Sequence, residues 1–410
     1  MLSPLSRRQL AAFSPLPGRA MARALMSGSG RGAESVERVV TMLRARYAAD
    51  LALLTDSGTS ALQLALRIAV AASGAARPVV ALPAFTCFEV ASAAVGAGVR
   101  VICYDLLPDR LAPDPDSLER ALLAGARVVV VSPLFGVPVE WESIEAQLAT
   151  HGAIAIEDAA QGHGSAWRDR PLGSLASLSV LSFGRGKGWT GGSGGALLLR
   201  GDVAASPLAR EWSTQTRATS ARSTRAIAAM AQWSFGRPSL YAVPSAIPAL
   251  GLGRTVYHPP APPRAMDGFA ASLLLATERA AAEEAEVRRR TGALWRDSLA
   301  GLSHVRLIDV PAGATAGYLR FPIRISRGGA RLTARDGARR LGIASSYPTP
   351  LDHLTAIRPR LVDSASACLG AETLARELVT LPTHSLLTAR DISAIADVVA
   401  GCGVVRERSA

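Results

Sequence analysis

The chain has 410 residues, of which 49% are hydrophobic and 19% charged, so it is a globular protein too long for one typical core and not a disordered chain. No run of about eighteen uncharged apolar residues occurs, and we therefore expect no membrane span. The net charge of +12 does not by itself indicate nucleic-acid binding, because the arginines are scattered, aromatic residues make up only 5%, and no zinc-finger or RNA-binding signature is present. The charge equally suits a small anionic substrate or cofactor.

Cysteine spacing and the basic N-terminus bear on the compartment. The chain has four cysteines: Cys87, Cys103, Cys368 and Cys402. They show neither paired nor metal-ligand spacing, which favours a reducing, cytoplasmic location and predicts no metal site. The first acidic residue is Glu34, so the N-terminus resembles a transit peptide. Because the whole chain is rich in alanine and arginine, we prefer a surface arm over residues 1–32.

The first half of the chain alternates between apolar strands and helices. Expected helices cover residues 33–46, 57–73, 116–124 and 144–151. Expected strands are LALLT (51–55), PVVALPAF (78–85), VRVICYD (99–105), ARVVVVSPLFG (126–136), AIAIED (153–158), LSVLSF (178–183) and GALLLR (195–200). This alternation predicts an α/β fold with a mostly parallel sheet covered by helices on both faces, and ligands at the carboxyl ends of the strands.

The second half predicts an elaboration and a smaller domain. Residues 203–263 are rich in Ser, Arg and Pro, with a helix at 224–233, and are expected to form an elaboration or connector. A long helix (270–299), two strands within YLRFPIRI and LGIASSY, and a closing helix (389–399) follow. The expected domains are a large domain at 33–263 and a small C-terminal α/β domain at 264–410.

Lys187, in LSFGRGKGWTGGSGG, is the one lysine of the chain; every other member of the 45 Lys and Arg residues is arginine. An amine can lose its proton when buried and attack a carbonyl, whereas a guanidinium stays protonated. The alternative is a lysine that survived by chance in an arginine-rich chain. A P-loop is excluded by spacing, because the required glycine and hydroxyl positions hold Leu181 and Gly188.

Two further motifs lie at the ends of expected strands. SGTSAL places Gly58, Thr59 and Ser60 where a helix begins, which suits an anion site or an ordinary helix cap. EDAAQGHG ends a buried strand with Glu157 and Asp158, and a carboxylate there needs a cationic partner unless it caps a helix.

Taken together, the motifs resemble the DegT/DnrJ/EryC1/StrS family of pyridoxal-phosphate-dependent sugar aminotransferases of fold type I. The matching stretches occur in the same order over about residues 33–399: SGTSALQLAL, LPAFTCFEVASAAVGAGVRVICYDL, PLFGVPVE, EDAAQGHG, PLGSLASLSVLSFGRGKGWTGGSGG and LPTHSLLT. The resemblance implies that residues 33–263 bind pyridoxal phosphate and that the protein is a homodimer with its active site at the subunit interface.

The resemblance also implies roles for individual residues. Lys187 would form the Schiff base with the cofactor, and Asp158 would keep the pyridine nitrogen protonated. Gln161 would lie near the phenolic oxygen. The phosphate would be held by residues at the helix start and after a later strand: Gly58, Thr59, Ser60 and Ser182. Residues implied to contact substrate are His163, Arg185, Arg264 and His353.

The chain departs from the family pattern at three places. Cys87 stands where the family usually stacks an aromatic residue on the cofactor, with Phe85 or Phe88 as substitutes. Ser193 replaces a glutamate, and Pro262 replaces the asparagine with which many members reach the partner's phosphate. Arg264 is then the expected replacement for that asparagine.

The expected activity is transfer of an amino group from glutamate or glutamine to a nucleotide-linked keto-deoxysugar. Lys187 argues against the dehydratase relatives, which carry histidine there. The alternatives are another pyridoxal-phosphate reaction, amination of a non-sugar natural-product intermediate, and a catalytically silent relative.

Overall fold

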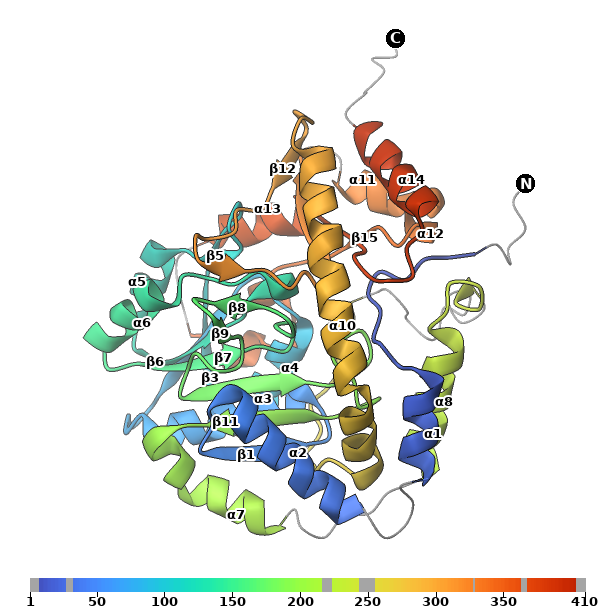
Figure 1. Cartoon of the computed structure of the whole chain (residues 1–410). Helices are drawn as coiled ribbons and strands as arrows, with labels where there is room; N and C mark the ends of the chain where they lie inside the picture. Colours follow the sequence, from blue (N-terminus) through green and yellow to red (C-terminus); the bar gives the residue numbers. More distant parts are fainter. Residues whose placement is uncertain are drawn as a thin grey trace.

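The large sheet forms the centre of the molecule (Figure 1). The computed structural model describes residues 7–26, 32–215, 223–242, 255–326, 329–362 and 367–402. Seven strands lie in the order β1-β11-β10-β7-β6-β2-β3. Their bounds are β1 (Leu51–Thr55), β2 (Val79–Pro83), β3 (Arg100–Tyr104), β6 (Ala126–Val131), β7 (Ile154–Asp158), β10 (Leu178–Ser182) and β11 (Gly195–Leu199). All seven lie within the strands expected from sequence.

The strand directions confirm a mostly parallel sheet. The pairs β10–β7, β7–β6, β6–β2 and β2–β3 are parallel, whereas β11 runs antiparallel to both β10 and β1. Strands β1, β10, β7, β6 and β2 therefore end at the same edge of the sheet. Chain segments that leave this edge can meet in one place.

Helices cover both faces of this sheet, as expected for buried parallel strands. One face packs against α3 (Gly58–Ala72) and α4 (Phe88–Ala97). The other face packs against four helices: α2 (Gly32–Tyr47), α5 (Pro115–Leu123), α6 (Trp141–Thr150) and α10 (Gly268–Leu299). Alternate strand residues supply the two cores; in β6, Val128 and Val130 face α3 and α4, while Val129 and Val131 face away.

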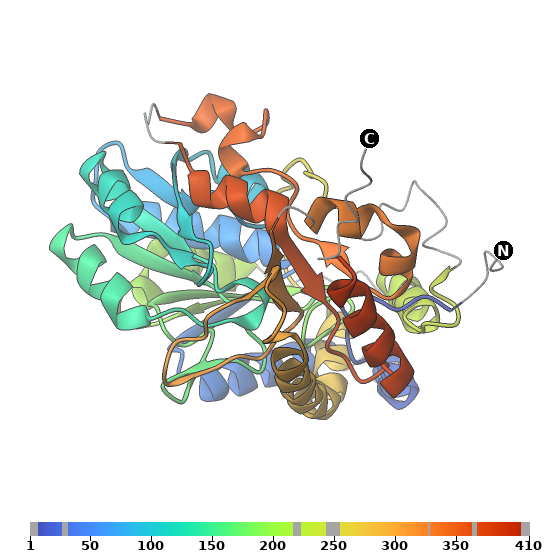
Figure 2. The same ribbon diagram turned by 90° about the horizontal axis from the view of Figure 1, so that it is seen from above.

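The C-terminal part builds a second, antiparallel sheet. Its order is β12 (Val305–Leu307), β14 (Phe321–Ile325), β16 (Leu378–Leu381) and β15 (Ala344–Ser345). Around it lie α11 (Gly329–Ala334), α12 (Asp336–Arg340), α13 (Leu369–Glu377) and α14 (Ala389–Ala400). Helix α10 joins the two parts: its first half packs on the large sheet, and Trp295 and Leu299 near its end pack in the second core (Figures 1 and 2).

The remaining strands of the described residues form two short sheets, one with two strands and one with three. One pairs β4 (Leu106–Leu107) with β5 (Ala112–Pro113). The other has the order β13 (Ala314–Thr315), β8 (Ala166–Trp167) and β9 (Arg170–Pro171).

The N-terminal residues pack against the later elaboration. Helix α1 (Gly18–Met26) contacts α10 and α8 (Ser223–Phe235), and its inward residues Ala20, Met21 and Ala24 are buried. Helix α8 confirms the helix expected at 224–233, and α7 (Pro207–Gln215) precedes it. Within the expected connector, residues 216–222 and 243–254 lie outside the described residues. None of the helices in the described ranges is both long and apolar enough to span a bilayer.

Glu157 is a buried carboxylate that holds a loop against the large sheet. It precedes Asp158 in β7, so the two side chains point to opposite faces. The fully buried Glu157 accepts hydrogen bonds from the N–H groups of Gly173 (2.6 Å) and Leu175 (2.9 Å) and from Ser179 Oγ (2.9 Å). Burial raises the pKa of Glu157, and these donors oppose that shift.

We expect Glu157→Ala to lower the free energy of unfolding by about 3 kcal/mol or more, because three buried donors lose their acceptor. Urea unfolding measures the change. Glu145, an exposed glutamate of α6, provides the control, and Glu145→Ala should change stability by less than about 0.5 kcal/mol. Equal effects of the two substitutions would contradict a structural role for Glu157.

Candidate active site

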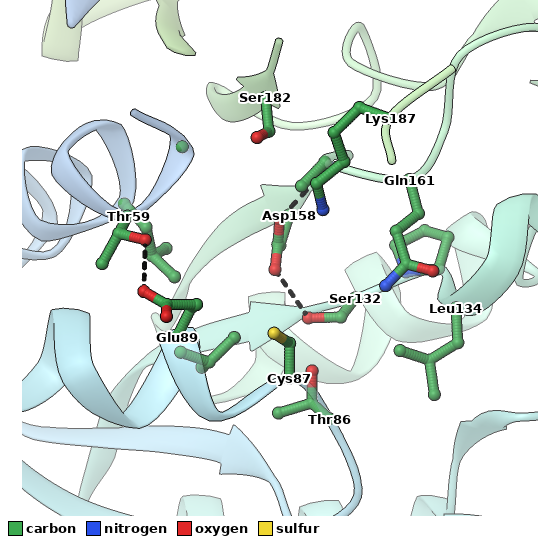
Figure 3. A pocket seen from close by; sticks show the side chains of 15 residues that line it. Thr59, Thr86, Cys87, Glu89, Ser132, Leu134, Asp158, Gln161, Ser182 and Lys187 are labelled. Atoms are coloured by element: carbon green, nitrogen blue, oxygen red, sulfur yellow. Dashed lines mark hydrogen bonds between the residues drawn. The ribbon is translucent and has the colours of Figure 1, made fainter. Parts of the chain in front are cut away.

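A cavity opens where the parallel strands end (Figure 3). The space within it, counted together with its opening to solvent, is about 550 Å³. Its lining residues are Gly58, Thr59, Leu62, Thr86, Cys87, Glu89, Val90, Ser132, Pro133, Leu134, Asp158, Ala160, Gln161, Ser182 and Lys187. They come from the segments that follow β1, β2, β6, β7 and β10, as the sheet topology requires.

The start of helix α3 forms one wall of this cavity. Ser57 caps the helix, with its hydroxyl accepting from Ser60 N–H at 3.1 Å. The first amides of a helix have no acceptor within it, so those of Gly58 and Thr59 are suited to bind an anion. A Cβ on Gly58 would lie 2.7 Å from Ser182 Cβ; only glycine lets the helix start approach the end of β10 this closely.

Asp158 and Lys187 point toward one another across the cavity (Figure 3). Asp158 Oδ1 accepts from Ala160 N–H at 3.2 Å, and Oδ2 accepts from Ser132 Oγ at 3.3 Å. Burial raises the pKa of Asp158, and the charge of Lys187 together with these two donors opposes that rise. The carboxylate is therefore poised to share a proton with a basic group placed against it.

Gln161 links the cavity to the second sheet. Its Oε1 accepts from Phe135 N–H at 2.9 Å, and its Nε2 donates to the Tyr347 hydroxyl at 2.8 Å. Burial raises the pKa of Tyr347, so the phenol stays protonated. The Tyr347 ring lies 5.2 Å from the Phe85 ring and stacks on Phe135 at 6.2 Å. Gln161 thereby has one fixed orientation.

Cys87, a predicted cofactor-binding residue, lines the cavity at the position where the resembling family usually has an aromatic residue. Burial raises the pKa of its thiol, and Lys187 opposes the rise, so the side chain acts as a small apolar group. Phe85 and Phe88 are buried in the cores and lie outside the cavity lining, so neither substitutes for the missing aromatic face.

Five predicted site residues lie outside the cavity lining: Ser60, His163, Arg185, Arg264 and His353. Ser60 is buried and donates to Asp56 Oδ1 at 2.6 Å, so it supports the helix start from behind. His163 packs 5.5 Å from the Trp189 ring, and burial together with Arg46 and Arg288 lowers its pKa to about 3, which keeps it neutral.

The other three are on the surface. Arg185, Arg264 and His353 are exposed in the single chain.

Glu89 is a cavity residue that the sequence reasoning missed. Its Oε2 accepts from Thr59 Oγ1 at 2.7 Å, and its Oε1 contacts His258 Nδ1 at 2.8 Å. An acidic residue in the first turn of a helix is an ordinary favourable pairing with the helix dipole, so nothing in the sequence marked Glu89. No sequence motif marked Thr86, Ser132 or Tyr347 as a site residue either.

The fold and the cavity define a helix-covered, mostly parallel sheet protein with an amine and a carboxylate at its strand ends. The sequence model of the DegT/DnrJ/EryC1/StrS aminotransferase family matches residues 19–400, so the chain belongs to that family. Membership implies pyridoxal phosphate as cofactor.

Two relatives are L-glutamine:2-deoxy-scyllo-inosose aminotransferases. The enzyme of Streptomyces kanamyceticus is 32% identical over 181 residues, 44% of this chain and 42% of its own length. That of Micromonospora echinospora is 27% identical over 350 residues, 82% of this chain and 75% of its own length. A crystal structure of 3-amino-5-hydroxybenzoic acid synthase superposes with a TM-score of 0.73 at 21% identity, covering 96% of this chain and 99% of that chain. This last likeness concerns the fold.

The donor set of the cavity fits pyridoxal phosphate. The cavity offers the amine of Lys187, a partly buried carboxylate whose pKa is raised, the start of a helix, and the hydroxyls of Thr59 on that helix and Ser182 at the end of β10. The missing Cβ at Gly58 lets the Ser182 side chain lie against that helix start, where free backbone amides suit an anion.

Glu89→Gln should tighten pyridoxal phosphate binding by about 3- to 10-fold, because a carboxylate beside the helix start repels a phosphate dianion. The amide can still accept from Thr59. Absorbance titrations with pyridoxal phosphate and with pyridoxal, which has no phosphate, show whether the substitution acts through the phosphate charge. The affinity for pyridoxal should be the same in the parent and in the variant. Glu145→Gln is the control, and a weaker affinity of the Glu89 variant for pyridoxal phosphate would contradict the assignment.

Proposed function

We propose that this protein is a pyridoxal-phosphate-dependent aminotransferase that transfers the amino group of glutamine or glutamate to a ring ketone of a sugar or cyclitol. The observation that carries the proposal is the position of Lys187, the one lysine of the chain, in the cavity opposite Asp158. The relatives named for 2-deoxy-scyllo-inosose support a cyclitol acceptor, and the family supports a nucleotide-linked keto-deoxysugar as the second acceptor to test.

When bound, pyridoxal phosphate supplies an aldehyde that reacts with amines and a ring that withdraws electrons. Lys187 Nζ would attach the cofactor and carry a proton to and from the substrate carbon. Asp158 would hold the proton on the pyridine nitrogen through a charge-assisted hydrogen bond. Gln161, fixed by Phe135 and Tyr347, would orient the ring from its edge.

The phosphate would bind at the start of α3. The amides of Gly58 and Thr59 and the hydroxyl of Ser182 line that end of the cavity. Ser60 contributes indirectly, because its hydroxyl bond to Asp56 and its amide bond to Ser57 fix the first helical turn.

A second candidate acceptor is a non-sugar keto acid. A relative named 3-amino-5-hydroxybenzoate synthase, 29% identical over 181 residues, and the lack of an aromatic face at Cys87 favour including it. If the protein binds the cofactor but removes the amino group from no donor, it would instead be a catalytically silent relative.

The proposal is tested by supplying α-¹⁵N-labelled glutamine or glutamate with 2-deoxy-scyllo-inosose, a nucleotide-linked keto-deoxysugar or a non-sugar keto acid. Mass spectrometry should find ¹⁵N in one of these acceptors. Lys187→Arg keeps the charge but removes the nucleophile, and should fold and transfer no label. The exposed control Arg279→Lys should match the parent. Label transfer by Lys187→Arg at the parental rate would refute the role of Lys187.

We also propose a homodimer in which Arg264 reaches the partner's cofactor phosphate. Pro262 offers no amide, and the exposed Arg264 side chain starts from a backbone fixed by Asp56 N–H donating to Arg264 C=O at 2.8 Å. Light scattering of the cofactor-loaded protein should give the mass of two chains, and Arg264→Ala should weaken cofactor binding. A monomer that retains the cofactor would exclude this arrangement.

A further inference from the structure

Ser14 bridges the two backbone groups that flank the Lys187 turn. Its hydroxyl accepts from Gly186 N–H at 2.8 Å and donates to Lys187 C=O at 3.0 Å. Gly186 has φ +77°, and the turn is closed by Lys187 N–H and Gly184 C=O at 3.4 Å. One buried side chain, from 172 residues earlier in the chain, thus fixes the backbone from which the lysine extends.

The rest of this turn has little packing of its own. A Cβ placed on Gly184 or on Gly186 would meet no atom of the described residues within 4 Å. Glycine also gives the backbone more conformational freedom than any other residue. The two hydrogen bonds of Ser14 therefore restrict a segment whose two glycines have no side chains to pack.

The N-terminal segment (residues 7–16) is itself anchored to rigid elements. The fully buried Arg288 of α10 donates to Phe13 C=O at 2.7 Å, next to Ser14. His384 Nε2 lies 2.9 Å from Leu10 C=O, and Gln9 Nε2 donates to Asp391 of α14 at 2.8 Å. Ser14 thus connects the Lys187 turn to α10 and to the C-terminal elements.

We propose that Ser14 is a positioning residue for Lys187, and that the N-terminal segment fixes the lysine through it. The inference rests on the proposed function, because it concerns how Lys187 meets the cofactor. Misplacing a reacting group by about 1 Å can cost about 100-fold in rate, even when substrate binding is unchanged. Loss of the Ser14 hydroxyl should therefore change the position of Lys187 and leave the other residues of the cavity in place.

The experiment compares Ser14→Ala and Gly186→Ala with the parent, each loaded with pyridoxal phosphate. Gly186→Ala perturbs the same turn while every residue of the N-terminal segment stays unchanged, since alanine disfavours φ +77°. The controls are Ser298→Ala, an exposed serine on α10, and Gly74→Ala, a glycine at φ +63° after α3.

Both turn variants should shift the pH midpoint of the bound cofactor's absorbance and lower kcat by about 10- to 100-fold, with the donor KM within about threefold. The two controls should keep the parental midpoint and kcat. The inference is overturned if Ser14→Ala keeps both, or if it lowers only the melting temperature. If the parent itself binds no cofactor, the proposed function fails instead.

Discussion

A partly buried carboxylate opposite the one lysine of the chain is the constraint on which this site depends. Asp158 ends β7 and Lys187 follows the adjacent parallel strand β10, so the sheet itself brings them together. Burial makes the charged form of Asp158 costly, and an ammonium, an amide and a hydroxyl offset part of that cost. A protonated pyridine nitrogen would supply the missing partner.

The site also requires that separate helices, strands and loops lie unusually close together. Gly58 lets the start of α3 lie against the end of β10, so that the anion-binding end of a helix and the carboxylate share one cavity. Tyr347 reaches in from the second sheet to fix Gln161, and Ser14 reaches in from the N-terminus to fix the Lys187 turn. Each of these residues acts through the backbone or side chain that it holds.

Much of this arrangement follows from sequence pattern. Strand β1 has the expected bounds, because LALLT is a short apolar run that ends at a polar residue on each side, Asp50 and Asp56. Lys187 and Asp158 were identified by their rarity and by motif, and both line the cavity. Their positions at strand ends were predictable since parallel strands share one carboxyl edge.

The remainder depends on contacts that sequence does not encode locally. Ser60 lies in the right motif, but its hydroxyl bonds to Ser57 and Asp56, and the residue lies outside the cavity lining. Tyr347 lies 186 residues from Gln161, and only the packing of the two sheets joins them. Glu89 belongs to an ordinary first helical turn, and its role arises from its hydrogen bond to Thr59 on another helix.

The most direct measurement asks which residue holds the cofactor. Protein loaded with pyridoxal phosphate is reduced with borohydride, digested with trypsin and mapped by mass spectrometry. The account predicts the cofactor on a single peptide from Gly186 to Arg200, with trypsin unable to cleave after Lys187. Cofactor fixed at the N-terminal amine, or at no residue, would contradict the account.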